Sequence, residues 1–229
     1  MKSHKFAKNV TDFLTHLSLP CKPPDGIDVL LPYASEEVCR VVQQMCATYY
    51  SSPDRRIAIW GINPGRFGAG LTGLAFTDPY AVDHLLGITS ALSGRRELSA
   101  KFVQKVIEQF GGPQLFYRHF YVTALSPLGY IKGTKNLNFY DDPRLQSTLT
   151  PQIQSWVREQ LEFGIRRDVT IVLGTGKLKL FFEREIRQQC GFSDVIYLEH
   201  PRFIMQYRRK RIHEYCDRYV STLQDVMVV

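Results

Sequence analysis

Four short runs of apolar, β-branched or aromatic residues recur along the chain, and stretches with helical periodicity separate them. The runs are Ile57–Trp60, Phe120–Leu125, Val169–Leu173 and Val195–Leu198. Short runs that are apolar throughout are typical of strands buried on both faces, as in a parallel sheet. Strands that alternate with helices therefore predict an α/β fold, a three-layer α/β/α sandwich around a central four-stranded parallel sheet.

Helical patterns fill most of the remaining chain. The predicted helices span residues 10–17, 35–50, 99–110, 151–163 and 177–189. Ser99 stands where it can cap the third helix, and Pro151 takes the first position of the fourth, where proline is favoured. Residues 129–144 carry no such pattern and are predicted to form a long irregular loop, of the kind that is usually functional or mobile.

The length of 229 residues suits one large domain and is too short for two. We expect a single domain over residues 1–229, in which residues 1–50 form a helical cover. No apolar run approaches the roughly 20 residues that span a bilayer, and no secretory leader is recognisable. The five cysteines are scattered without a CxxC pair, which argues against a disulfide framework, a zinc site or an iron–sulfur cluster. We expect an intracellular monomer, in the cytoplasm or nucleoid if bacterial, without a membrane partner.

The first apolar run ends in a loop with the features of a binding site. Its backbone breakers are Gly61, Pro64, Gly65 and Gly68, and Asn63 is the uncharged polar side chain among them. Ligands of open parallel sheets bind beyond the carboxyl ends of the strands, where glycines let the backbone approach them closely. A tight turn in which Asn63 bonds its own backbone is the structural alternative. The segment Thr72–Phe76 returns a large aromatic ring to this loop, which favours a site.

Polar residues follow the other three runs. Ser126 follows the second run, Lys177 ends the segment Gly174-Thr175-Gly176-Lys177 after the third, and His200 follows the fourth. These strand ends are expected to share one rim with Asn63. A glycine pair with a lysine at a helix start can hold a phosphate, although the spacing is not that of a P-loop. A lone histidine is more often structural than catalytic, but its place at a strand end favours a role for His200.

The net charge of +7 points to a polyanionic partner, and its distribution is more informative than its size. Between residues 202 and 218 the basic residues are Arg202, Arg208, Arg209, Lys210, Arg211 and Arg218. Phe203, Met205 and Tyr207 are interleaved with them. Basic side chains beside aromatic and apolar ones suit phosphate contact together with base stacking or wedging. A solvated basic helix face is the alternative.

Together the motifs resemble the uracil-DNA glycosylase superfamily. The first motif is Gly61-Ile62-Asn63-Pro64-Gly65 with Phe67-Gly68, followed by Thr72-Gly73 and Phe76, and the second is His200-Pro201. In this combination they are most similar to the single-strand-selective monofunctional (SMUG-type) branch, while the first motif alone also resembles the mismatch-specific uracil/thymine branch. The resemblance covers residues 56–211 and implies that they form the core of a uracil-DNA glycosylase-like fold.

The resemblance implies a role for each matching residue. Asn63 would position the hydrolytic water or the scissile nucleotide, and His200 would hydrogen-bond O2 of uracil as charge builds on the departing base. Phe76 would stack on the flipped base, and Gly65 would face its C5 position. Gly61, Ile62, Pro64 and Phe67 would complete the base-binding loop. The DNA-binding residues would be Lys177, Arg208, Arg209 and Arg211, with Arg202, Phe203, Ile204 and Met205 filling the gap left by the base.

Two positions depart from the family pattern. The SMUG-type branch ends its second strand with an Asn that reads the Watson–Crick edge of the pyrimidine, and Ala124 stands there in this chain. Loss of that amide removes the best discriminator of uracil from cytosine, so other deaminated bases become expected substrates. Reading would then fall to backbone groups, water, or the neighbouring Thr123 and Ser126. Arg202-Phe203 replaces the family's Ser-Pro, which leaves the intercalating residue unassigned.

The resemblance implies a monofunctional DNA glycosylase of base excision repair. It would flip out and hydrolytically release uracil, and other deaminated or C5-modified bases, from single-stranded or mismatched DNA. No metal or organic cofactor is implied. Two other functions stay open, namely a non-catalytic nucleic-acid-binding protein on a degenerate glycosylase fold and a nucleoside hydrolase-like enzyme for small molecules.

Overall fold

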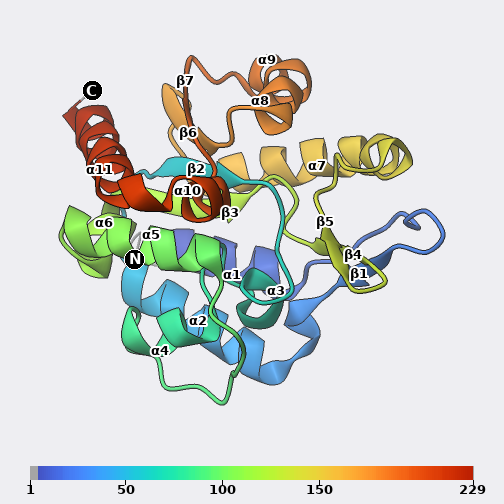
Figure 1. Cartoon of the computed structure of the whole chain (residues 1–229), viewed down its shortest axis with the longest axis horizontal. Helices are drawn as coiled ribbons and strands as arrows, with labels where there is room; N and C mark the ends of the chain where they lie inside the picture. Colours follow the sequence, from blue (N-terminus) through green and yellow to red (C-terminus); the bar gives the residue numbers. More distant parts are fainter. Residues whose placement is uncertain (1–4, 229) are drawn as a thin grey trace.

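A parallel sheet of four strands runs through the middle of the computed structural model, which describes residues 5–228 (Figure 1). Its strands are β2 (Ile57–Gly61), β3 (Phe120–Ala124), β6 (Val169–Leu173) and β7 (Asp194–Leu198). Their order across the sheet is β3-β2-β6-β7, and every neighbouring pair is parallel. Each predicted strand differs from the observed one by a single residue at most, and the predicted α/β fold with a four-stranded parallel sheet is confirmed.

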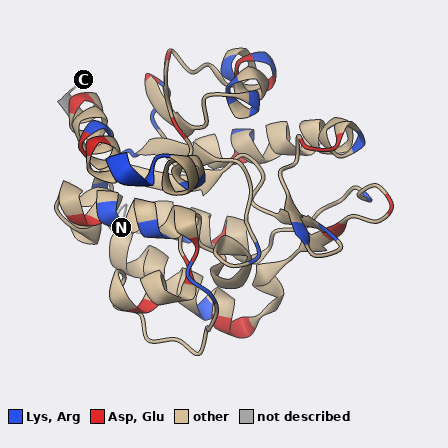
Figure 2. Cartoon of the chain, in the orientation of Figure 1, with Lys and Arg blue, Asp and Glu red and all other residues tan. Residues whose placement is uncertain are grey.

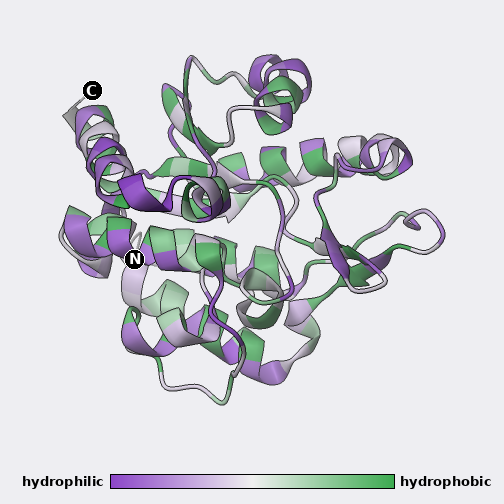
Figure 3. Ribbon diagram, in the orientation of Figure 1, coloured by the Kyte–Doolittle hydropathy of each residue, from purple (hydrophilic) through white to green (hydrophobic). Residues whose placement is uncertain are grey.

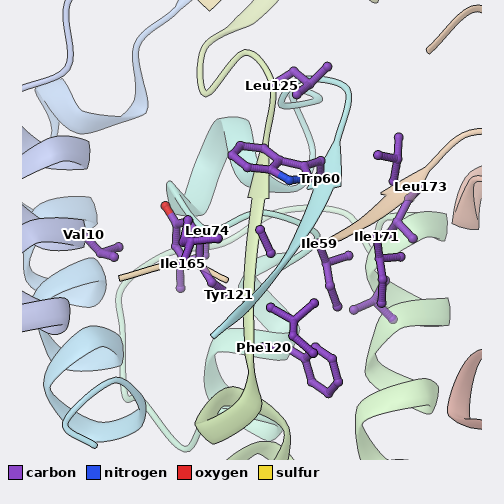
Figure 4. Close-up of a cluster of buried hydrophobic side chains, with 14 of the residues drawn as sticks. Val10, Ile59, Trp60, Leu74, Phe120, Tyr121, Leu125, Ile165, Ile171 and Leu173 are labelled. Carbon is purple, nitrogen blue, oxygen red and sulfur yellow. The ribbon is translucent and has the colours of Figure 1, made fainter. Parts of the chain in front are cut away.

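Different helices cover the two faces of this sheet. Phe120 packs on Phe110 of one helix, with ring centroids 5.5 Å apart. The next residue, Tyr121, packs on Phe6 of another helix at the same centroid distance of 5.5 Å. Because consecutive strand residues point to opposite faces, the two helices lie on opposite sides (Figure 4). One layer contains α5 (Leu98–Phe110), α6 (Pro113–His119) and α11 (Ile212–Val228), and the other contains α1 (Lys5–Thr15), α7 (Pro143–Leu161) and α8 (Lys177–Phe182).

Helices in both layers are amphipathic. Figure 3 shows hydrophobic and hydrophilic residues alternating along α7 and α11. The apolar sides of the helices join a core cluster of buried residues that extends from Phe6 to Val226. Between residues 5 and 228, no helix is both long enough and apolar enough to cross a membrane.

A second, smaller sheet lies to one side of the parallel one (Figure 1). It consists of β1 (Asp28–Leu30), β4 (Gly129–Lys132) and β5 (Lys135–Leu137), antiparallel in the order β1-β4-β5. Gly133 and Thr134 form the turn between β4 and β5, and Gly133 has a φ of +58°, which glycine adopts without strain. The irregular loop predicted for residues 129–144 is therefore wrong, because strands of four and three residues are too short to show periodicity.

Two predicted helix starts also differ from the structure. α7 begins at Pro143, not at Pro151, because Asp142 caps it and accepts two backbone N–H bonds of 2.9 and 3.3 Å from the first turn. Pro151 lies inside the helix. α5 begins just before Ser99, which was predicted to cap it and is instead buried in its first turn.

The basic stretch after β7 is not one helix. The first part, α10 (Pro201–Tyr207), packs against α5 and ends where Arg208 takes up φ −126° and ψ 23°. A 3₁₀ turn (Arg209–Arg211) follows, and α11 begins after it. The basic residues therefore do not share the face of one helix, because the break places Arg208–Arg211 beyond the end of α10.

Short elements complete the described chain. They are a 3₁₀ turn (Pro32–Ala34), α2 (Glu36–Tyr49), α3 (Ala69–Thr72), α4 (Pro79–His84), a π-helical turn (Glu183–Arg187) and α9 (Gln188–Cys190). Within the range predicted as a helical cover, α1 packs on α2, but the strand β1 lies between them in the chain. Residues 1–4 of that range lie outside the described residues.

Candidate active site

A pocket opens at the carboxyl ends of β2, β3 and β7, the edge of the sheet at which the sequence predicts a site. Its main wall is the pocket loop, which we define as residues 61–77, between β2 and α4. The predicted residues that line the pocket are Gly61, Ile62, Asn63, Pro64, Gly65, Phe76, Ala124, His200 and Arg202. The fold thus brings together residues that lie up to about 140 positions apart in the sequence, as parallel strand ends should.

Asn63 is locked by its side chain to the backbone that follows β5. Its Oδ1 accepts the N–H of Phe139 at 3.0 Å, and its Nδ2 donates to the carbonyls of Leu137 at 3.0 Å and Pro64 at 3.2 Å. The N–H of Phe139 needs an oxygen opposite it, so this network settles the orientation of the carboxamide. One lone pair of Oδ1 remains for a water or a substrate group.

Glycine at the end of β2 lets an aromatic ring close the pocket. A Cβ at Gly61 would lie 2.7 Å from Cε2 of Phe76, so any side chain there would displace the ring. Likewise, a Cβ at Gly129 would lie 2.5 Å from the carbonyl oxygen of Pro64. The pocket loop therefore packs closely against both β2 and the small sheet, which leaves it little freedom to move.

The backbone of Phe76 is strained. Within residues 5–228 it is the single non-glycine residue with a positive φ, at +53°. Such a conformation costs of order 1–3 kcal/mol and persists only where the surrounding structure enforces it. The ring is half-buried, and its centroid lies 5.8 Å from that of the His200 imidazole. A flat ring that enters the pocket can therefore stack on Phe76 beside His200.

His200 is a neutral hydrogen-bond donor. Its Nδ1 accepts the N–H of Arg202 at 3.1 Å, which caps α10 and places the proton on Nε2. Burial and, to a smaller extent, the Arg202 guanidinium lower the pKa of His200 to about 4. At neutral pH the imidazole is uncharged, and its Nε2–H is free for a ligand in the pocket that His200 lines.

The space beside Gly65 is occupied. A Cβ there would lie 2.8 Å from Oε1 of Glu97 and 3.4 Å from Nδ2 of Asn136. The resemblance implies that the missing side chain at Gly65 leaves room for a C5 substituent of the base. In the structure, two polar side chains occupy this space. A base substituent placed there would therefore contact the Glu97 carboxyl and the Asn136 amide.

The end of β3 offers the pocket no polar side chain. Ala124 and Thr123 both line the pocket, but the hydroxyl of Thr123 donates its proton to Gln160 of α7 at 2.6 Å. Ser126 is fully buried, and its hydroxyl is bonded to a backbone carbonyl at 3.0 Å and to Tyr130 at 2.8 Å. Both hydroxyls are committed inside the core, so neither is placed to replace the Asn that the family has at this strand end.

The other residues of the predicted site lie outside the pocket, and they are Phe67, Lys177, Phe203, Ile204, Met205, Arg208, Arg209 and Arg211. The ring of Phe67 stacks with the guanidinium groups of Arg66 and Arg95, at 4.7 and 5.8 Å from the ring centroid. Lys177 is exposed at the start of α8. Ile204 lies on the buried face of α10 and is fully buried, so its side chain cannot contact DNA.

An exposed aromatic and basic surface lies on the basic segment, which we define as Arg202–Arg211. Phe203 and Tyr207 are 39% and 60% exposed, and their ring centroids are 5.4 Å apart. The guanidinium of Arg208 lies 5.2 Å from the Phe203 ring. Figure 2 shows Lys and Arg at the junction of α10 and α11, and among them Arg211 is paired with Glu214 at 2.6 Å.

Polar residues that line the pocket without having been predicted for it include Glu97, Asn136 and Asn138. Glu97 precedes a helix and carries no local pattern that distinguishes it from a surface carboxylate. The two asparagines fall in the stretch 129–144, whose length predicted a functional segment but not which of its residues would face the site.

Comparison with known proteins agrees with this geometry. A family model for the uracil DNA glycosylase superfamily matches residues 48–225, which include both motifs. The crystal structure of wild-type SMUG2 from Pedobacter heparinus is similar to this chain, with 36% sequence identity and a TM-score of 0.93. The match covers 98% of this chain and 99% of that one. A search of curated proteins found no significant match.

Proposed function

The chain belongs to the uracil-DNA glycosylase superfamily, as its motifs predicted, and is a DNA glycosylase; on that premise we propose that it excises deaminated bases by flipping them into the pocket. The observation that carries the proposal is the joint placement of three groups in one pocket. They are a carboxamide fixed by backbone bonds at Asn63, a neutral imidazole at His200 and the half-buried ring of Phe76.

The departing base calls for a hydrogen-bond donor. Cleavage of the N-glycosidic bond leaves positive charge on the sugar and negative charge on the base, which is delocalised from the ring nitrogen onto an exocyclic carbonyl oxygen such as O2 of uracil. The Nε2–H of His200 suits that oxygen, because its other nitrogen is already an acceptor for the Arg202 N–H. A preorganised donor of this kind is typically worth about 10²–10³ in rate.

The attacking water calls for an acceptor. The Oδ1 of Asn63 keeps one lone pair after it accepts the Phe139 N–H, and its position is fixed to the backbone. An uncharged amide orients a water but is a weak general base. We therefore expect hydrolysis driven by charge stabilisation on the sugar and the base, without a covalent enzyme intermediate.

The expected base range follows from the walls of the pocket. Phe76 accepts any flat base by stacking, and Ala124 adds no amide that would confine the pocket to uracil. We infer that uracil and other deaminated bases are released, and that bases which flip easily are preferred. Single-stranded and mismatched sites should rank above a U·A pair, because unstacking a paired base costs a few kcal/mol.

The basic segment is the element we expect to engage DNA. Phe203 and Tyr207 are exposed on the same helix whose cap is His200, so an aromatic side chain stands close to the pocket mouth. A flat apolar side chain can fill the gap that a flipped base leaves in the stack. Phe203 is the better wedge because Arg208 lies against its ring and can contact a phosphate at the same time.

The test is an oligonucleotide assay followed by alkali, which cleaves at abasic sites. Strands carrying uracil, 5-hydroxymethyluracil, hypoxanthine or xanthine would be compared as single strands, in mismatches and in pairs. Release of the deaminated bases with single strands preferred would support the proposal. DNA binding without abasic sites would instead indicate a non-catalytic protein, and salt-independent hydrolysis of free nucleosides would indicate a nucleoside hydrolase-like enzyme.

A further inference from the structure

The pocket holds a carboxyl group that the chemistry above does not use. Glu97 is the residue before α5, and its Oε1 lies 2.8 Å from the position of a Cβ at Gly65. Its Oε2 fills the position of a Cβ at Gly68. Two of the glycines in the pocket loop therefore leave space that Glu97 takes, and a side chain at either position would push the carboxyl away.

An amide converges on the same place. Nδ2 of Asn136 lies 3.4 Å from the position of a Cβ at Gly65, next to Oε1 of Glu97. The Oδ1 of Asn136 accepts the N–H of Arg66 at 3.3 Å, which decides that the amide nitrogen is the end that faces the glycine. A hydrogen-bond acceptor and a hydrogen-bond donor thus stand side by side over Gly65.

The acceptor is held in place from behind. Asp78 is fully buried, and its Oδ2 accepts the N–H of Glu97 at 2.9 Å and Nε–H of Arg96 at 3.0 Å. Its Oδ1 caps α4 through the N–H of Ala81 at 2.9 Å. The main chain at Glu97 is therefore anchored to a buried charge, so the carboxyl is presented by a rigid support.

This pair matches the edge that deamination creates. Deamination of cytosine, adenine or guanine converts an exocyclic amino group into a carbonyl and leaves a proton on the adjacent ring nitrogen. A lactam edge therefore offers an acceptor beside a donor, whereas the parent cytosine or adenine offers the reverse. Asn136 supplies a donor and Glu97 an acceptor, as a lactam requires.

We propose that Glu97 and Asn136 are the specificity residues that replace the missing strand-end amide, with Asn136 donating to the base carbonyl and Glu97 accepting the neighbouring ring N–H. The inference rests on the proposed function, since it names how the same pocket selects its substrate. Glu97 also accepts a hydrogen bond from the Ser99 side chain, which holds its carboxyl in place. An unaltered base would set its amino group against the Asn136 amide and its unprotonated ring nitrogen against the Glu97 carboxyl, and mismatched buried polar groups reject a ligand strongly.

The experiment uses two variants of the full chain and one matched control. Glu97→Gln removes the charged acceptor, and Asn136→Asp removes the donor. The control is Glu108→Gln, at the far, exposed end of α5. Single-turnover release of uracil, hypoxanthine and cytosine from single strands is measured, together with binding of strands that carry non-cleavable 2′-fluoro-2′-deoxyuridine or 2′-fluoro-2′-deoxycytidine. Thermal melting confirms that each variant is folded.

We expect each variant to lose uracil release by about 10- to 100-fold, the value of one hydrogen bond to a charged group. The binding preference for fluorouridine over fluorocytidine should fall with it, most in Asn136→Asp, while Glu108→Gln stays like wild type. An equal loss for every base with an unchanged binding preference would overturn the inference and make Glu97 a group that acts on the water.

Failure of the inference differs from failure of the proposed function. If wild type releases uracil but both variants keep its full preference for uracil, the proposed role of Glu97 and Asn136 is wrong and the glycosylase activity stands. If wild type releases no base yet prefers fluorouridine and the variants lose that preference, the proposed role of Glu97 and Asn136 stands and the proposed base excision is wrong. A wild type that neither releases uracil nor prefers fluorouridine overturns both.

Discussion

The pocket loop and the basic segment meet at one site but are held in different ways. In the pocket loop, Asn63 makes three bonds to backbone groups, and Phe76 is kept in a strained conformation by close packing. In the basic segment, Phe203 and Tyr207 are exposed on α10, and Arg208 is exposed just after that helix ends. The first region holds its groups by hydrogen bonds and close packing, and the second leaves long side chains exposed to solvent.

The difference reflects what each region has to recognise. Charge that develops on a base or a water is stabilised only by groups whose position is set in advance. Phosphates and base steps are contacted by flexible charges whose effect is spread over several residues. Substitutions in the pocket loop and at His200 should therefore act on the rate, and substitutions in the basic segment should act on binding.

The largest expected effect tests whether substitutions in the pocket change the rate of base release. His200→Ala should reduce single-turnover uracil release by about 10²–10³-fold, because the donor to the departing base is lost. Binding of uracil-containing DNA should stay close to wild type. His84→Ala is the matched control, since His84 is exposed and stacks on Tyr80 away from the pocket. Near-normal release by the His200 variant would sink the assignment.

Asn63→Ala should act on rate and on stability together. The expected loss in single-turnover release is again about 10²-fold or more, because the held water is lost. Removal of the side chain also leaves the Phe139 N–H and the Leu137 carbonyl without their partner, and an unsatisfied buried group costs about 1–3 kcal/mol. A lower melting temperature should accompany the lower rate. A variant that is less stable but fully active would show that Asn63 is only a structural latch.

A smaller effect is expected for the base edge over Gly65. Wild type should release 5-hydroxymethyluracil ahead of thymine, by about 10-fold, since the C5 hydroxyl can accept the second N–H of the Asn136 amide, beside the one directed at the base carbonyl, and a methyl cannot. Gly65→Tyr should remove this difference, because its side chain displaces the carboxyl. Gly176→Ala is the control, because a Cβ there meets no atom within 4 Å. Equal release of the two bases by wild type would contradict the polar character of this niche.

The basic segment should give changes of a few-fold that depend on salt. Arg208→Ala should weaken DNA binding and lower the slope of log K against log salt by about 0.7 on single strands, the value of one phosphate contact. Arg211→Ala should do less, because that guanidinium is already paired with Glu214. Binding would be measured from low to moderate salt, with single-turnover release as the control that stays constant. An unchanged slope for both variants would make the segment a solvated surface.

The smallest expected effect concerns pH and stability. The pKa of His200 falls from 6.5 to about 4 in the folded state, so below pH 6.5 the unfolded chain takes up a proton that the folded chain does not. Stability should therefore fall as the pH drops from 6.5 towards 4. Between pH 6.5 and 4 the melting temperature of His200→Asn should fall less than that of wild type. From pH 7 to 8 the melting temperatures of both proteins should change alike. Identical pH profiles would show that the imidazole is not buried in a neutral form.

Much of the fold could be predicted because its signals are local. A strand buried on both faces has to be apolar throughout, so β2 and β6 were recognisable from a few residues each. β4 and β5 were not, because strands this short gain their order from pairing with each other and with β1. The start of α7 was misplaced for a different reason, since two prolines stood at possible first positions and only the capping bonds of Asp142 decide between them.

By itself, the sequence determined the α/β class and the membership of a glycosylase family, and it singled out Asn63, Phe76 and His200 as candidate site residues, since each depends on a motif or a period contained in one segment. Tertiary structure alone decided that Glu97 and Asn136 meet over Gly65 and that Ser126 and Ile204 turn into the core. It also decided which nitrogen of His200 carries the proton. Contacts between distant segments depend on how the helices and the small sheet pack, and no local pattern encodes that packing.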